Sequence, residues 1–117
     1  MAGITTHVLD SNRGRPLAGI RIDLSVLEGS DWKFVKSVTT NADGRTDAPM
    51  VKPDDAKVGE YELVFHIDEH FEKQGGGSAP APFVDRAVVR FSVFDAKQHY
   101  HVPLLCTPGS CSTYRGS

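Results

Sequence analysis

Apolar and polar residues alternate along the stretch Ile20-Arg21-Ile22-Asp23-Leu24-Ser25-Val26. Because successive side chains of a β-strand point to opposite faces, this period of two is typical of a strand with one buried face. Segments rich in β-branched and aromatic residues predict further strands at 32–38, 61–65 and 87–93. Another strand-like segment runs from 100 to 105, close to the end of the chain.

Turn-forming residues separate these segments. Examples are Asn12-Arg13-Gly14, Asn41-Ala42-Asp43-Gly44 and Lys52-Pro53-Asp54-Asp55. Seven or eight short strands with such close turn spacing predict an all-β fold, an antiparallel two-sheet β-sandwich. We also predict one short helix over 68–74, with Asp68 capping its start and Gly75 ending it. The Gly- and Pro-rich segment 75–82 is predicted to be a surface loop.

Size and charge exclude several classes of protein. The 117 residues suit a single domain, 1–117, because one core commonly takes about 100–150 residues. The net charge of −2 provides no basic surface for nucleic acid and no polybasic patch for a membrane. No apolar stretch approaches the roughly 20 residues that span a bilayer. The first six residues lack the basic and apolar regions of a secretory signal, so we expect the protein to remain inside the cell.

Cys106 and Cys111 are the two cysteines of the chain. In a reducing cytosol the default expectation is two free thiols. If the two residues lie on adjacent strands of a hairpin, a redox-labile pair remains an alternative. Neither residue stands in a recognisable nucleophile motif, so a catalytic cysteine is disfavoured.

Histidine and arginine are the residues best suited to chemistry here. His7 lies in a predicted first strand and His101 in a late one, and a sandwich can make such strands neighbours. His99 and His101 are two residues apart and share one face of their strand. Histidine titrates near neutral pH and therefore suits proton transfer. Arg45 follows a tight Asp-Gly turn, where its guanidinium can clamp a carbonyl-rich or anionic ligand.

Each of these residues also has a structural interpretation. His66 and His70 are expected at the surface or the edge of the core, and Arg45 alone is typical of a solvated turn. A metal site built around His99-x-His101 is disfavoured, because no acidic residue follows at the spacings of common zinc hydrolases. We therefore expect no metal. These residues alone predict only a β-sandwich with scattered histidines.

Several motifs in a fixed order add a resemblance that spans nearly the whole chain. They are Thr6-His7-Val8-Leu9-Asp10, Arg13-Gly14-Arg15-Pro16, Asp43-Gly44-Arg45-Thr46-Asp47, His99-Tyr100-His101-Val102-Pro103-Leu104-Leu105 and Ser112-Thr113-Tyr114-Arg115-Gly116-Ser117. With them the chain resembles the transthyretin-like family, and more narrowly its 5-hydroxyisourate hydrolase branch. The resemblance implies two four-stranded sheets with one short helix. It also implies a homotetramer, a dimer of dimers with active sites in the channel between dimers.

The resemblance implies a site and a reaction as well. The catalytic set carried over is His7, Arg45, His101 and Ser117, and Tyr114 joins His7 and Arg45 in binding the substrate. The implied reaction is hydrolysis of 5-hydroxyisourate to 2-oxo-4-hydroxy-4-carboxy-5-ureidoimidazoline in urate degradation, without metal or organic cofactor. His101, with or without His7, is expected to act as general base. Arg45 is expected to stabilise charge on the carbonyl oxygen, and Ser117 to orient a histidine or the water.

Some features depart from the family pattern or leave alternatives open. The family usually has tyrosines where this chain has Gly109 and Cys111, which reduces the aromatic area available for subunit contact. A carrier of small hydrophobic ligands and an immunoglobulin-like interaction module are the alternative functions. A Ser-Lys-Leu type address is missing at the C-terminus, which favours a cytoplasmic location over a peroxisomal one without excluding the latter.

Overall fold

The structure is a computed structural model that describes residues 3–69, 84–107 and 109–116. Within these ranges the chain forms eight β-strands, one 3₁₀ helix and the start of another helix at 67–69, and most of the strands follow the alternating segments of the sequence. In chain order they are β1 (Gly3–Asp10), β2 (Arg15–Pro16), β3 (Arg21–Glu28), β4 (Asp31–Thr39), η1 (Pro53–Asp55), β5 (Gly59–Phe65), β6 (Ala87–Val93), β7 (His99–Thr107) and β8 (Ser110–Thr113).

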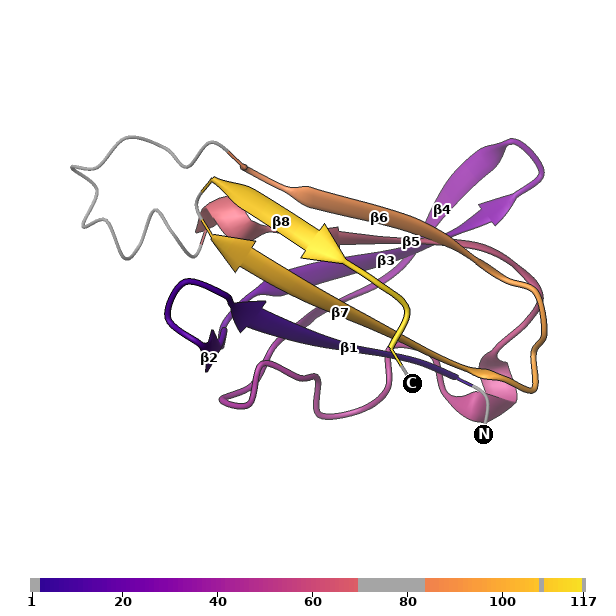
Figure 1. The fold of residues 1–117 in the computed structure, drawn as a ribbon. Helices are drawn as coiled ribbons and strands as arrows, with labels where there is room; N and C mark the ends of the chain where they lie inside the picture. The colour runs from indigo at the N-terminus through magenta and orange to yellow at the C-terminus, as the bar shows by residue number, and fades with distance from the viewer. Residues whose placement is uncertain (1–2, 70–83, 108, 117) are drawn as a thin grey trace.

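The strands form two four-stranded sheets, with strand orders β2-β1-β7-β8 and β4-β3-β5-β6, packed face to face (Figure 1). The predicted all-β sandwich is confirmed. Most neighbouring strands are antiparallel, as predicted, but β1 and β7 run parallel, from Gly3 opposite His99 to Asp10 opposite Cys106. A parallel neighbour requires a crossover, and here the whole second sheet lies between the two strands in the sequence. This one pairing brings the two ends of the chain together.

The second sheet consists of antiparallel strand pairs. β3 and β4 are joined by a two-residue loop, because Glu28 pairs with Asp31 across it. Gly29 has a φ of 64° at the first central position, where a type II′ turn favours glycine. β5 and β6 continue the sheet with an unbroken antiparallel register from Gly59 opposite Val93 to Phe65 opposite Ala87.

The core lies between the sheets and collects the inward residues of each alternating strand. In β3 the buried residues are Ile22 and Leu24, two positions apart, as the alternation predicts. β5 contributes its alternate residues in the same way. The side chains that are most completely buried are Ile4, Val8, Ile20, Ile22, Leu24, Met50, Leu63, Phe65, Ile67, Val93 and Leu104.

The predicted helix is observed only at its start. Residues 67–69 are helical, whereas 70–74 and the predicted loop 75–82 lie outside the described residues. Because Ile67 is already helical and fully buried, the helix begins one residue earlier than predicted and Asp68 is not its cap. Within the described ranges, no helix is long and apolar enough to cross a membrane.

The default prediction of two free thiols is wrong. Cys106 of β7 and Cys111 of β8 are directly paired in the antiparallel register and form a disulfide, with their Cα atoms 4.2 Å apart. The expectation rested on the usual redox state of the cytosol, which takes no account of strand pairing. The β7–β8 hairpin places the two side chains opposite each other, so the alternative noted from the sequence is the one observed.

Candidate active site

Polar side chains gather on the outer face of the β2-β1-β7-β8 sheet. Thr5 and His7 alternate with buried residues along β1, and His99 and His101 do the same along β7. In the parallel register Thr5 pairs with His101. The two strands therefore bring histidines from opposite ends of the sequence to one surface, as the sequence analysis expected for His7 and His101.

A tight turn brings Arg45 to the same surface. The side-chain oxygen of Asn41 accepts hydrogen bonds from the backbone N–H groups of Asp43 and Arg45, at 2.9 and 3.2 Å. Arg45 then pairs with His7 through an isolated antiparallel bridge. Gly44 lies so close to β1 that a Cβ there would collide with the Val8 carbonyl oxygen, and its φ is 73°. The turn needs glycine at this position for both reasons.

His7 uses one of its ring nitrogens to hold this turn. Its Nε2 lies 2.8 Å from the backbone carbonyl oxygen of Asp43. A carbonyl oxygen only accepts hydrogen bonds, so Nε2 must carry the hydrogen and donate it. In neutral His7 the unprotonated nitrogen is therefore Nδ1.

His101 is enclosed by three neighbours. Its Nδ1 lies 2.9 Å from the Thr5 hydroxyl oxygen, and its ring is stacked with that of His99 at 6.5 Å between centroids. The C-terminal segment returns across β7 after β8 (Figure 1), and the Gly116 N–H donates to the His101 carbonyl oxygen at 2.8 Å. A Cβ on Gly116 would lie 2.6 Å from His101 Cδ2, so this close approach also favours glycine.

The surroundings of His101 favour its neutral form. Partial burial lowers the pKa of His101 below its usual value of 6.5, because the charged imidazolium loses hydration. The positive charges of Arg45, His99 and His7 lower this pKa further. A neutral imidazole at neutral pH can accept a proton, which is the property that a general base requires.

The structure brings together three of the four predicted catalytic residues, His7, Arg45 and His101. The fourth, Ser117, lies outside the described residues. The predicted substrate contact Tyr114 is not in this group: it is 61% exposed and lines a cavity of about 230 Å³ beside β6. Arg115 fixes the backbone next to Tyr114 against β7. Its guanidinium packs 4.3 Å from the Tyr100 ring centroid and donates to the His99 carbonyl oxygen.

A shallow cavity of about 170 Å³ lies beside Thr5 and Arg45, and no histidine is among the described residues that line it. It is lined by Thr5, Thr6 and Arg45 together with the next four residues, 46–49. In the part of the chain that the structure describes, no carboxylate lies within ion-pair distance of the Arg45 guanidinium. No group of three or more potential metal ligands occurs among the described residues either. The cavity is therefore lined by one cation, Arg45, and one carboxylate, Asp47, while the hydroxyls of its threonines are already hydrogen-bonded within the protein.

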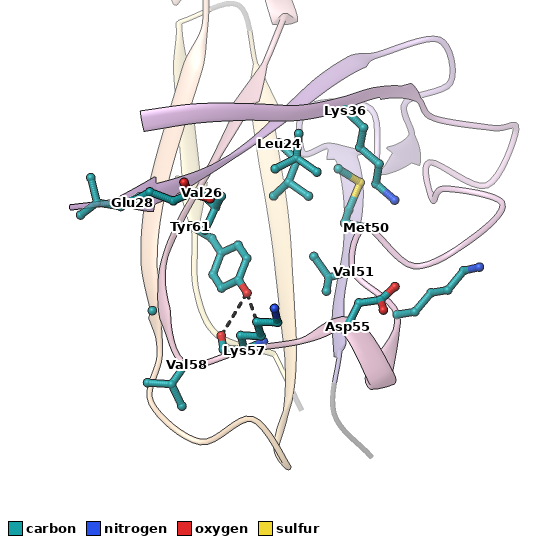
Figure 2. A pocket seen from close by; sticks show the side chains of 14 residues that line it. Leu24, Val26, Glu28, Lys36, Met50, Val51, Asp55, Lys57, Val58 and Tyr61 are labelled. Carbon is teal, nitrogen blue, oxygen red and sulfur yellow. Dashed lines mark hydrogen bonds between the residues drawn. The ribbon is translucent and has the colours of Figure 1, made fainter. Parts of the chain in front are cut away.

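A larger cavity of about 440 Å³ lies elsewhere and differs in chemistry (Figure 2). Leu24, Met50 and Val51 form its apolar wall, and Tyr61 within it uses its hydroxyl on the backbone of Lys57. Among the described residues that line it there is no histidine and no arginine. It shares no lining residue with the cavity beside Arg45 and is lined by none of the candidate site residues.

Comparison with known proteins identifies the family. The HIUase/Transthyretin family profile matches residues 4–116. This chain belongs to the HIUase/Transthyretin family. It is 50% identical over 115 residues to the 5-hydroxyisourate hydrolase of Deinococcus radiodurans, covering 98% of this chain and 96% of that one. The resemblance recognised in the sequence is thereby confirmed.

Two solved structures share the fold of this HIUase/Transthyretin family member. The 5-hydroxyisourate hydrolase of Klebsiella pneumoniae superposes with a TM-score of 0.77 at 32% identity, and each chain is covered completely. The transthyretin of Sparus aurata superposes with a TM-score of 0.87 at 22% identity, covering 99% of this chain and 97% of that one. The second likeness concerns the fold alone.

One residue of the cluster was not predicted from the sequence: Thr5, whose hydroxyl contacts both His99 and His101. Its position two residues before His7 on an alternating strand was a usable signal, because the two side chains share a face. His66, in contrast, lies away from the cluster. It is buried directly after β5 of the second sheet, with Nε2 2.7 Å from Asp23 Oδ2.

Proposed function

We propose that this protein hydrolyses 5-hydroxyisourate to 2-oxo-4-hydroxy-4-carboxy-5-ureidoimidazoline in urate degradation. The observation that carries the proposal is the convergence of His7, Arg45 and His101 on one sheet face. Relatives named 5-hydroxyisourate hydrolase, up to 50% identical over nearly the full chain, support the choice of substrate.

The proposed first step is attack of water on a ring carbonyl carbon. His101 is the general base, because its lowered pKa keeps it neutral and its Nδ1 is already engaged by Thr5. Its Nε2 takes a proton from water as the oxygen bonds to the carbon. Cleavage of the ring C–N bond then releases the nitrogen, which takes up the proton held by His101 Nε2. The neutral base is thereby regenerated.

Arg45 is proposed to hold the substrate and to stabilise the negative charge that develops on the attacked oxygen. Its guanidinium lies beside the cavity and has planar N–H donors suited to adjacent carbonyl oxygens. His7 is proposed as a second substrate contact through Nδ1, since Nε2 is used on Asp43. Ser117 and Tyr114 keep their predicted roles as proposals.

No metal or organic cofactor is part of the proposed mechanism. Amide hydrolysis needs a base, a stabilised oxyanion and a protonated leaving group, and the residues above supply each of them. The hydrolase is therefore expected to keep its full activity after dialysis against a chelator.

A homotetramer, a dimer of dimers, is the proposed assembly. The edge strands of the two sheets support this proposal. β8 is an edge strand of one sheet, and β6 is an edge strand of the other. Exposed apolar residues, Val88 on β6 and Phe94 and Tyr114 nearby, lie close to these edges. Such edges and side chains favour pairing with a second copy.

A cytoplasmic location is kept as a proposal, with a peroxisomal location as the alternative. The Cys106–Cys111 disulfide weighs against both, because disulfides are rare in reducing compartments. Trapping of free thiols in intact cells tests this directly, since alkylation of both cysteines would fit a reducing compartment.

The proposed activity is tested with 5-hydroxyisourate made freshly by urate oxidase. We expect its ultraviolet absorbance to disappear faster with the purified protein than in the blank, which reports spontaneous decay. Sedimentation of the same sample measures the oligomer. Loss no faster than the blank, from folded and tetrameric protein, would favour the carrier or interaction-module alternatives.

The pH dependence of this activity follows from His101. Its pKa lies below 6.5 in the folded protein, so the neutral base is present above that lowered value and is lost as the pH falls through it. We expect kcat/KM to be near its plateau at neutral pH and to fall to half of the plateau at a pH below 6.5. Initial rates in buffers of constant ionic strength measure this profile, and a half-plateau point above pH 6.5 would contradict it.

A further inference from the structure

One hydroxyl group bridges the two histidines of β7. Thr5 Oγ1 lies 2.9 Å from His101 Nδ1 and 2.9 Å from His99 Nε2. The parallel pairing of β1 and β7 sets this geometry, because it places Thr5 directly opposite His101. All three side chains are half-buried, so water competes only partly for these hydrogen bonds.

The hydrogen atoms and lone pairs available limit the bridge to three arrangements. A threonine hydroxyl donates one hydrogen and accepts through two lone pairs. When both histidines are neutral, at most one ring nitrogen can accept from Oγ1, so at least one of the two must donate to it. His101 Nδ1–H can donate to Thr5 while Thr5 donates to His99, the same chain can run in reverse, or both histidines can donate to Thr5.

Only the reversed chain leaves His101 unable to act as a base through Nε2. If His101 Nδ1 carries the hydrogen, Nε2 has a free lone pair. If the chain runs in reverse, the hydrogen is on Nε2 and that nitrogen cannot accept another. The first arrangement also survives protonation, because an imidazolium still donates from Nδ1 to Thr5 without any rotation of the hydroxyl.

We propose that Thr5 is a positioning residue that holds His101 in the Nδ1–H tautomer, with His99 accepting the hydrogen bond at the far end of the chain. The proposal rests on the proposed function, in which His101 Nε2 is the general base. It gives His99 a role, although the family resemblance leaves that residue outside the catalytic set. The second nitrogen of a functional histidine is commonly fixed by such a hydrogen bond.

Other charged groups face His101 and must be considered with Thr5. They are Arg45 from the turn, His7 from β1 and His99 from β7 itself. Together with the larger effect of burial, these groups lower the pKa of His101, whereas the proposed role of the Thr5 contact is to set which nitrogen carries the hydrogen when His101 is neutral. The two effects are separable, because removing the hydroxyl leaves all three charges in place.

Thr5→Val tests the proposal, because valine keeps the shape of threonine and removes the hydroxyl. We expect kcat to fall about tenfold or more, the scale seen when the partner that orients a functional histidine is removed. KM should change little, since Thr5 acts through His101. Thr5→Ser should restore most of kcat, and Thr39→Val, at an exposed position of β4, is the matched control.

The second readout is the protonation of the imidazole nitrogens by ¹⁵N NMR, with the His101 signals assigned from His101→Asn. We expect Nδ1–H in the wild type and a shift towards Nε2–H in Thr5→Val. An Nε2–H tautomer in the wild type, or a wild-type kcat in Thr5→Val, would overturn the proposal. This readout needs no substrate, so it separates failure of the tautomer assignment from failure of the proposed hydrolase activity.

Discussion

His101→Asn is expected to lower kcat for 5-hydroxyisourate by about 10²- to 10⁴-fold, the range that positioned general bases contribute. Asparagine can keep a polar group near Nδ1 and Thr5, but it has no basic nitrogen at the position of Nε2. The backbone contact from Gly116 to the His101 carbonyl oxygen does not depend on the side chain. We therefore expect the fold and the oligomer to persist.

Stopped-flow absorbance gives kcat for this variant, and thermal unfolding with sedimentation confirms that the protein is intact. Lys57→Gln is a suitable control, because Lys57 lies at the larger cavity and away from the histidines. Turnover within a few-fold of the wild type, in a tetrameric variant, would remove His101 from the role of base and direct attention to His7.

Arg45→Ala is expected to lower kcat by about 10²- to 10³-fold, the scale for removing one donor to a developing oxyanion. Arg45→Lys should recover part of this loss, because it restores the charge without the planar fork. The backbone bridge from Arg45 to His7 remains in both variants, so the turn should stay in place. Removing the guanidinium should also raise the pKa of His101, since its positive charge contributes to lowering that pKa.

Steady-state kinetics of both variants measure the first effect, and an NMR titration of His101 measures the second. Arg86→Ala is the matched control, an exposed arginine just before β6. If Arg45→Ala changed only KM and left kcat intact, Arg45 would bind the substrate without stabilising the transition state. An unchanged His101 pKa would show that the guanidinium does not reach the imidazole in solution.

Local patterns predicted most of the strands. The alternation from Ile20 to Val26 identified β3, and the segment 87–93 matches β6 residue for residue. Both predictions succeeded because the period of a strand is a property of neighbouring residues and needs no knowledge of the partner strand. The shared face of His99 and His101 followed from the same period.

Predictions that depended on distant contacts were less complete. The parallel pairing of β1 with β7 was not foreseen, and with it the Thr5 contact was missed. The same limit explains the disulfide, which depends on the β7–β8 register rather than on composition. Tyr114 was grouped with the histidines through the family motif, yet in one subunit it lies at the β6 side.

The sequence by itself determined which segments become strands, which face of each is buried and to which family the chain belongs. These properties depend on residues that are close together in the sequence or on motifs that occur in a fixed order. Only the tertiary structure decided that Thr5, His7 and Arg45 meet His101 on one surface. Strand partners are selected by hydrogen bonding and core packing between segments up to 96 residues apart, and no local pattern encodes that choice.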